Sequence, residues 1–285
     1  MWFTPGMLPD DITTELTRLC TAHLGAETGP RVAALARNGF TLSPVDDGAG
    51  ASGRFRFGGP ALLEPGTPWP EFEGTPLTLL AVVDTDALRP WLDAPLPAGA
   101  GLLNVFYLGY ESALADDVAA SRQAHFEAPM DWRVVPADPA TAVEAAPPAG
   151  GVVLPARPVR ADPVVALPDS TGSHLAPARH EENTAEVWEA FERLLDRLPD
   201  GTGKDGVLAG IRNLPESGDD GHRAFGWPWA MQGMPVPVET RVHLLQLDTD
   251  PAWTWADCGM VTFEIPADAL RAGDFSQVDC TMESC

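Results

Sequence analysis

Three segments from the first half of the chain recur, in the same order, in its last third. Residues 57–60 match 225–228, residues 79–86 match 243–250, and residues 101–105 match 259–263. One such match arises easily by chance, but three in order and with similar spacing predict an internal duplication. We therefore expect two diverged repeats that pack as one unit about a pseudo-two-fold axis.

The repeated segments have the patterns of β-strands. Residues 79–83 form a continuous apolar run, which is typical of a strand buried on both faces, and the aspartates after it favour a turn. Residues 54–57, 101–107 and 131–135 also have strand patterns, while 29 Pro and 27 Gly leave room for few long helices. The predicted fold class is mainly β (α+β): a duplicated β-roll of two diverged repeats with a few flanking helices.

Helical spacing of apolar residues predicts helices over 10–24 and 30–38, and a third near 184–198. Residues 136–179, rich in Pro, Ala, Gly and Asp, indicate an extended connection with short strand pieces such as residues 164–165. We expect one domain over 1–285. Its parts are an N-terminal helical segment (1–48), a first β repeat (49–135), a Pro/Ala-rich connection (136–182), a helix (183–199) and a second β repeat (220–285).

The chain is strongly acidic, with 41 Asp and Glu against 18 Lys and Arg and a formal net charge of −23. This charge repels nucleic-acid phosphates and anionic membrane surfaces, so neither is an expected partner. It favours a basic protein partner or a small cationic ligand, although it also serves solubility alone.

The four cysteines form no CxxC pair and no disulfide framework, which indicates reduced thiols. The first basic residue is Arg18, so the start of the chain lacks the pattern of a signal peptide, and no apolar run is long enough to cross a bilayer. These features predict a cytoplasmic protein.

Residues 48–53 fit the letters of a dinucleotide-binding loop, but a strand pattern follows where that site needs a helix. Lys204 lacks the glycine spacing of a phosphate-binding loop, and histidines and cysteines lack zinc-ligand spacing. We therefore expect no cofactor and no tightly bound metal.

Cys258 is a candidate nucleophile, because it lies in a predicted turn near His243 on the preceding strand. The adjacent Asp257 argues against this role, since a nearby carboxylate raises the pKa of a thiol. A free cysteine is more often a small buried side chain.

The acidic residues at the ends of the predicted strands are the stronger candidates for a site. Asp-x-Asp pairs supply oxygen ligands for a weakly bound Ca²⁺ or Mg²⁺, but aspartates also form turns by accepting backbone N–H groups. Tryptophans in the repeated segments, such as Trp255, are either core residues or the wall of a groove. The candidate binding residues are Asp248, Asp257, Trp255, Gln246, His243, Asp84 and Asp250, and Asp86 belongs to the same acidic set.

Several short motifs resemble those of the YwqG-like family of bacterial proteins. In the first half they are residues 56–60, 65–66, 69–70, Gly74, 76–77 and 80–81; in the second they are His222, Gly226, Pro228, Gln232, 244–250, 255–259, 268–270 and 274–276. The resemblance implies a mostly-β, duplicated roll with flanking helices and no established biochemical function. The chain departs from the family pattern at Val82, where Gln is usual, and at Ala256, where Gly is usual.

Two functions remain open at this point. One is a non-catalytic binding protein, for example an immunity-type protein that neutralises a partner; family analogy alone suggests a link to toxin systems. The other is an enzyme of small-molecule metabolism with a site in the cleft between the two repeats, using Asp257, His243 or Cys258. A deep apolar pocket with convergent polar groups favours the enzyme, and a flat acidic face favours the binding protein.

Overall fold

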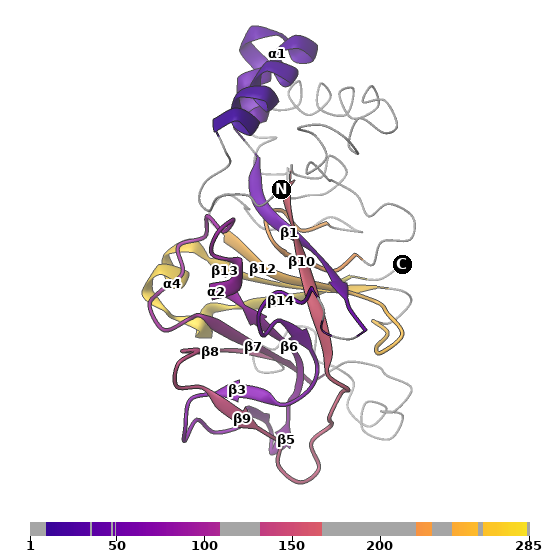
Figure 1. The fold of residues 1–285 in the computed structure, drawn as a ribbon. Coiled ribbons are helices and arrows are strands. Elements are labelled where there is room, and N and C mark those ends of the chain that lie inside the picture. The colour runs from indigo at the N-terminus through magenta and orange to yellow at the C-terminus, as the bar shows by residue number, and fades with distance from the viewer. Residues whose placement is uncertain are drawn as a thin grey trace.

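A ten-stranded antiparallel sheet dominates the molecule (Figure 1). The computed structural model describes residues 10–34, 36–46, 48, 50–108, 132–166, 221–229, 241–255 and 259–283. The strands follow the order β14-β13-β12-β11-β1-β10-β2-β6-β7-β8 across the sheet. The bounds of these strands are β1 Arg37–Pro44, β2 Arg56–Phe57, β6 Thr78–Asp84, β7 Leu102–Tyr107, β8 Trp132–Ala137, β10 Arg157–Ala166, β11 Arg223–Phe225, β12 Arg241–Asp248, β13 Met260–Pro266 and β14 Asp279–Glu283.

Smaller elements surround the sheet. Two two-stranded sheets pair β3 (Ala61–Leu63) with β9 (Val143–Ala145) and β4 (Glu71–Phe72) with β5 (Thr75–Pro76). The described helices are α1 (Asp10–Ala33), α2 (Thr85–Leu88), α4 (Ala267–Ala272) and the 3-10 helix η5 (Phe275–Gln277). None of these described helices has both the length and the apolar character that a membrane span requires. The mainly β class predicted from the strand patterns is confirmed.

The sheet curls so strongly that its two ends approach each other. At one end, the Trp132 side chain on β8 donates its Nε1–H to the Val278 carbonyl oxygen beside η5, at 2.7 Å. Across the interior, the Tyr107 ring on β7 contacts the rings of Trp255 and Phe263 edge to face, with centroids 5.7 and 6.4 Å apart. The result is a nearly closed roll whose interior holds one large apolar core.

The strand pairs β6–β7 and β12–β13 have the same register. Each pair contains one irregularity near its start, between Leu79 and Ala81 in β6 and between His243 and Leu245 in β12. These are matching positions of the repeated sequence segment, because residues 79–86 correspond to 243–250. After the bulge, Ala81 and Val83 in β6 and Leu245 and Leu247 in β12 belong to the roll's core. Val82, between the first two, belongs to a separate apolar cluster.

The helical prediction for the N-terminal segment is partly wrong. The helix over 10–24 is confirmed, and Gly25, with a φ of 85°, then separates it from a second helical piece inside α1. That second piece ends at Ala33 rather than at residue 38, and β1 begins at Arg37. Phe40 and Leu42 alternate with half-buried residues, and this period of two prevails over the weak helical pattern.

The prediction of an extended connection over 136–182 needs a larger correction. Residues Arg157–Ala166 form β10, a ten-residue strand at the centre of the sheet, between β1 and β2. Pro163 lies where β10 has β1 as its only neighbour, so it need not break a ladder bond. The helix predicted near 184–198 lies outside the described residues.

Candidate functional site

The two strand-end aspartates, Asp84 and Asp248, bind backbone N–H groups. Oδ2 of Asp84 accepts from the Arg54 N–H at 2.7 Å, and Oδ1 caps α2 through the Ala87 N–H at 3.0 Å. Oδ2 of Asp248 accepts from the Gly221 N–H at 3.1 Å, while Oδ1 accepts from the Thr249 N–H at 2.7 Å. Arg54 and Gly221 lie two residues before β2 and β11, so each aspartate ties a strand end to the start of its neighbour.

Gln246 has a comparable structural role. Its side-chain oxygen accepts from the Trp229 N–H at 2.8 Å, and its amide nitrogen donates to the Gly221 carbonyl at 2.9 Å. The residue is fully buried on β12. Gln246 therefore fixes the chain that flanks β11.

The first half has Val82 at the corresponding position, and a different residue supplies the amide. Asn104, which lies directly opposite Val82 on β7, accepts from the Leu62 N–H at 2.7 Å and donates to the Leu62 carbonyl at 2.6 Å. Leu62 corresponds to Trp229 when β2 and β11 are superposed by register. The departure at Val82 therefore goes with an amide on the next strand, which keeps the hydrogen bond to the corresponding backbone N–H.

A buried polar cluster joins Asp250 to Arg157 and His222. Oδ2 of Asp250 accepts from Arg157 Nη1 at 2.6 Å and lies 3.3 Å from His222 Nε2, while Oδ1 accepts from the Ala252 N–H at 2.6 Å. His222 Nδ1 accepts from the Asp248 N–H at 3.0 Å, so the ring proton resides on Nε2, facing Asp250. The carboxylate and the imidazole are fully buried.

Opposing effects act on the pKa of Asp250. Burial favours the neutral acid, but hydrogen bonds from His222, Arg157 and the Ala252 N–H outweigh it and hold the pKa below its ordinary value. The Arg157 guanidinium carbon also lies 4.7 Å from the centre of the Trp253 ring. Asp250 is therefore an ionised carboxylate that links the central strand β10 to the turn after β12 by hydrogen bonds.

The remaining predicted site residues divide between core, surface and the undescribed part of the chain. Trp255 and Trp253 are core side chains, and both donate their indole N–H to the Asp248 carbonyl, at 3.2 and 2.7 Å. Asp86 is exposed and pairs with Arg89 at 2.9 Å. Asp257 and Cys258 lie outside the described residues. Within the described ranges, no three acidic, histidine or cysteine side chains are arranged to hold a metal ion.

Cys20, one of two buried cysteines in the described part of the chain, lies within α1. Burial raises the pKa of the Cys20 thiol to about 11. A thiol with this pKa is protonated at neutral pH, so Cys20 is not poised for nucleophilic attack.

The outer face of β11–β14, turned away from the roll's core, carries buried polar and ionisable side chains. His243 and Glu264 are direct cross-strand partners, only 1% and 4% exposed, and Gln246 pairs with Thr262 two residues further on. We call this surface the polar outer face. Its buried members are Arg223, His243, Gln246, Thr262, Glu264 and Glu283.

The corresponding face of β6–β8 is largely apolar, with the buried amide of Asn104 as an exception. Leu79 and Phe106 occupy the register positions of His243 and Glu264, and they belong to a buried apolar cluster that includes β3. Burial raises the pKa of Glu264, and the positive charges of Arg241 and Arg37 counteract this only in part. Two strand pairs of equal register thus bury an apolar pair in one half and an ionisable pair in the other.

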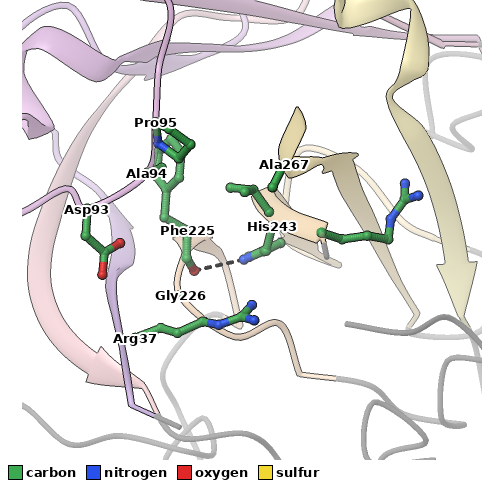
Figure 2. A pocket seen from close by; sticks show the side chains of 10 residues that line it. Arg37, Asp93, Ala94, Pro95, Phe225, Gly226, His243 and Ala267 are labelled. Carbon is green, nitrogen blue, oxygen red and sulfur yellow. Dashed lines mark hydrogen bonds between the residues drawn. The ribbon is translucent and has the colours of Figure 1, made fainter. Parts of the chain in front are cut away.

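A cavity of about 190 Å³ opens at the start of β12, beside the polar outer face. Figure 2 shows Asp93, Arg37 and His243 around it, on three separate segments of the chain. The Phe225 backbone borders the cavity with a φ of 56°, a left-handed conformation that is uncommon for an aromatic residue. His243 Nδ1 donates to the Phe225 carbonyl at 2.8 Å and holds this conformation.

Of the predicted residues, only His243 lines this cavity, and Gln246 lies on the adjoining face. Sequence reasoning missed Arg37, Asp93, Arg241 and Glu264. One signal was present in the sequence. Extending the match of residues 101–105 with 259–263 by one residue sets Phe106 against Glu264, an apolar residue against a carboxylate. Arg37 and Asp93 lie outside the repeated segments, and only the folded chain brings them to the cavity.

Comparison with known proteins gives a family without an assigned activity. A model of the family described as Domain of unknown function (DUF1963) matches residues 55–285, which is most of the chain and includes the sheet from β2 to β14. No curated protein matches the chain. The chain therefore belongs to the family described as Domain of unknown function (DUF1963).

Proposed function

We propose that this protein is a non-catalytic binding protein whose site comprises the cavity and the adjoining polar outer face. The observation that carries the proposal is the His243–Glu264 pair, buried where the matching strand pair holds Leu79 and Phe106. Burying ionisable groups costs free energy that an apolar pair does not cost. Since the apolar pair meets the needs of the fold, the ionisable pair has another use, and ligand recognition is the use that its place beside a cavity supports.

The hydrogen bonds of the motif residues support a non-catalytic role. Asp84, Asp248 and Gln246 each hold backbone groups, and Asp250 neutralises Arg157. The oxygens of Asp84 and Asp248 are occupied by backbone N–H groups of neighbouring segments. These residues therefore act in folding rather than in acid–base chemistry.

One observation favours the alternative, an enzyme with its site between the halves. Glu264 has a raised pKa beside a histidine and a cavity, and perturbed carboxyl groups of this kind occur at catalytic sites. The enzyme hypothesis therefore makes Glu264 a proton donor or acceptor. It requires chemical change of a bound compound, which the binding hypothesis does not.

The expected partner is a basic protein or a small cationic ligand in the cytoplasm. The net charge of −23 accelerates the approach of cations and repels nucleic acid and anionic membranes. Within this proposal, an immunity-type protein that neutralises a basic partner is the more specific form. The narrower YwqG-like identity, suggested by the short motifs, belongs to the same proposal.

We also propose that the roll arose by duplication. The repeated segments fall on β2–β6–β7 and β11–β12–β13, and the bulges at Leu79 and His243 support their equivalence. In this proposal β1 and β10 are the first strands of the two repeats, each pairing with the other repeat's second strand. The repeat boundaries would then begin near residues 37 and 157, earlier than the repeated segments alone indicate.

The proposal is tested by giving the second half the residues of the first. We expect the double variant His243→Leu, Glu264→Phe to fold, because removal of two buried ionisable groups compensates for losing the hydrogen bond that His243 donates to the Phe225 carbonyl, a loss of about 1–3 kcal/mol. Scanning fluorimetry of the full chain compares thermal protection by polar small molecules of both charge signs and by a hexa-arginine peptide. The parent should be protected by at least one probe that fails to protect the double variant.

The control is Arg160→Gln, Asp162→Asn, which removes an exposed ion pair on β10. It should retain the parent's protection by every probe. A double variant that binds like the parent would show that the polar outer face is not the site. Chemical change of a protecting compound, detected by NMR, would replace the binding hypothesis with the enzyme.

A further inference from the structure

Charges of both signs line the cavity. Arg37 comes from the first residue of β1, Arg241 from the first residue of β12, and Asp93 from the segment after α2. A site for a simple anion needs no carboxylate, and a site for a simple cation needs no arginine. We propose, resting on the binding function proposed above but with a zwitterion in place of a cationic partner, that the cavity binds a free amino acid, with its carboxylate between Arg37 and Arg241 and its ammonium group on Asp93.

The arginines are held in place by neighbouring groups. The Arg37 guanidinium carbon lies 3.6 Å from the centre of the Trp227 ring, a close cation–π contact. A stacked guanidinium donates hydrogen bonds only within its plane, so the ring sets the direction in which Arg37 donates. This arrangement favours a planar, two-oxygen acceptor such as a carboxylate.

Arg241 is fixed from the other side of the cavity. Its Nη2 donates to the Glu264 carbonyl at 3.2 Å and to the exposed carboxylate of Asp279. Among the described residues, its buried Nε–H has no hydrogen-bond partner. A buried donor without an acceptor is costly, and a small rotation of the guanidinium toward a bound carboxylate would satisfy it.

The rest of the cavity suits a small, partly apolar ligand. Ala94, Pro95, Phe225, Val242 and Ala267 supply apolar lining between the charged groups. A volume of about 190 Å³ is below the range of drug-sized pockets, which begins near 300 Å³, and matches a ligand of a few heavy atoms. An amino acid with an aliphatic side chain has this size and this distribution of charge.

The backbone at the cavity adds a second indication. The left-handed conformation of Phe225 costs free energy, and such strain persists at binding sites when surrounding contacts enforce it. Strand register shifts the sequence match of residues 57–60 with 225–228 by one residue, so the positions of Phe225 and Gly226 are those of Gly58 and Gly59. These two glycines follow β2 and adopt left-handed conformations without strain. The second half therefore holds an aromatic residue against the cavity where the first half has glycine.

Isothermal titration calorimetry of the full chain against the common L-amino acids tests the proposal. The tightest binder is then compared with its analogue without the ammonium group and its analogue without the carboxylate; for L-leucine these are 4-methylpentanoate and 3-methylbutylamine. Each analogue should bind about tenfold more weakly or worse, because each loses a charge-assisted hydrogen bond. Asp93→Asn should weaken amino-acid binding to the level of the ammonium-free analogue and leave that analogue's affinity unchanged.

Arg37→Gln should weaken the amino acid and the ammonium-free analogue together, while the Arg160→Gln, Asp162→Asn control binds like the parent. Asp93 is exposed, so thermal unfolding should confirm that its variant folds normally. Failure of every amino acid to bind, equal affinity for the analogues, or an Asp93→Asn variant indistinguishable from the control would overturn the proposal. If a singly charged probe protects the parent but not the double variant of the preceding test, the amino-acid proposal fails while the binding function stands.

Discussion

At the scale of single residues, Asp250 shows how a motif carboxylate is used inside the roll. It receives hydrogen bonds from Arg157 and the Ala252 N–H and faces the Nε2–H of His222. These partners come from β10, from the turn after β12 and from the segment before β11. Removing its charge would leave Arg157 without a counter-ion beside the Trp253 and Phe57 rings.

Asp250→Asn should therefore lower the free energy of unfolding by about 2 kcal/mol at neutral pH. Because folding lowers the pKa of Asp250, its contribution is present above the unfolded-state pKa of about 3.9 and is lost as pH falls through the lower folded-state pKa. The difference between parent and variant, measured by urea unfolding, should shrink below about pH 4. Asp162→Asn, in an exposed ion pair, should lower the free energy of unfolding by less than about 1 kcal/mol. An equal decrease in both variants would contradict the linking role of Asp250.

At the scale of elements, the two halves fix the chain flanking their second strands with amides on different strands. Gln246 acts from β12, and Asn104 acts from β7, the strand beside the one that carries Val82. A side chain on a neighbouring strand reaches the same backbone group because cross-strand partners lie side by side on one face.

This exchange predicts a compensation between two positions. Asn104→Thr, which installs the residue found in β13, should lower the free energy of unfolding by about 1–3 kcal/mol because the buried Leu62 N–H and carbonyl lose their partner. Adding Val82→Gln should restore part of that loss, whereas Val82→Gln alone should destabilise the protein. Urea unfolding of the three variants measures the coupling, and purely additive effects would contradict it.

At the scale of the whole molecule, the halves are interleaved along the sheet. β11 pairs with β1 on one side, and β10 separates β1 from β2. The core likewise mixes residues distant in sequence, for example Phe57 with Trp253 and Tyr107 with Phe263. Neither half of the chain therefore forms a complete sheet without the other.

We accordingly expect residues 180–285 expressed alone not to fold. That fragment lacks β1, so β11 becomes an unpaired edge, and it lacks the first-half side of the core. Urea titration of the fragment, followed by circular dichroism, should show no cooperative unfolding transition. The full chain should show one under the same conditions. A cooperative, soluble fold of the fragment would mean that the halves are independent.

The sequence alone determined which segments become most of the strands and where several end. The apolar run in β6 and the alternation over residues 54–57 reflect burial on two faces or one, and aspartates at strand ends bind backbone N–H groups. These effects depend on residues close together in the chain, so they can be recognised in the sequence. The mainly β class followed from the same local patterns.

The tertiary structure alone decided which side chains meet. β10 is central because β1 and β2 pair with its two edges. Asn104 takes the place of a glutamine because it lies opposite Val82. Arg37, Asp93 and Arg241 line one cavity although they come from three distant segments. His243 was predicted, but its partner Glu264 was not, since their pairing depends on strand register. Register and strand order arise from contacts between residues far apart in the chain, and a linear pattern read over a short window does not contain those contacts.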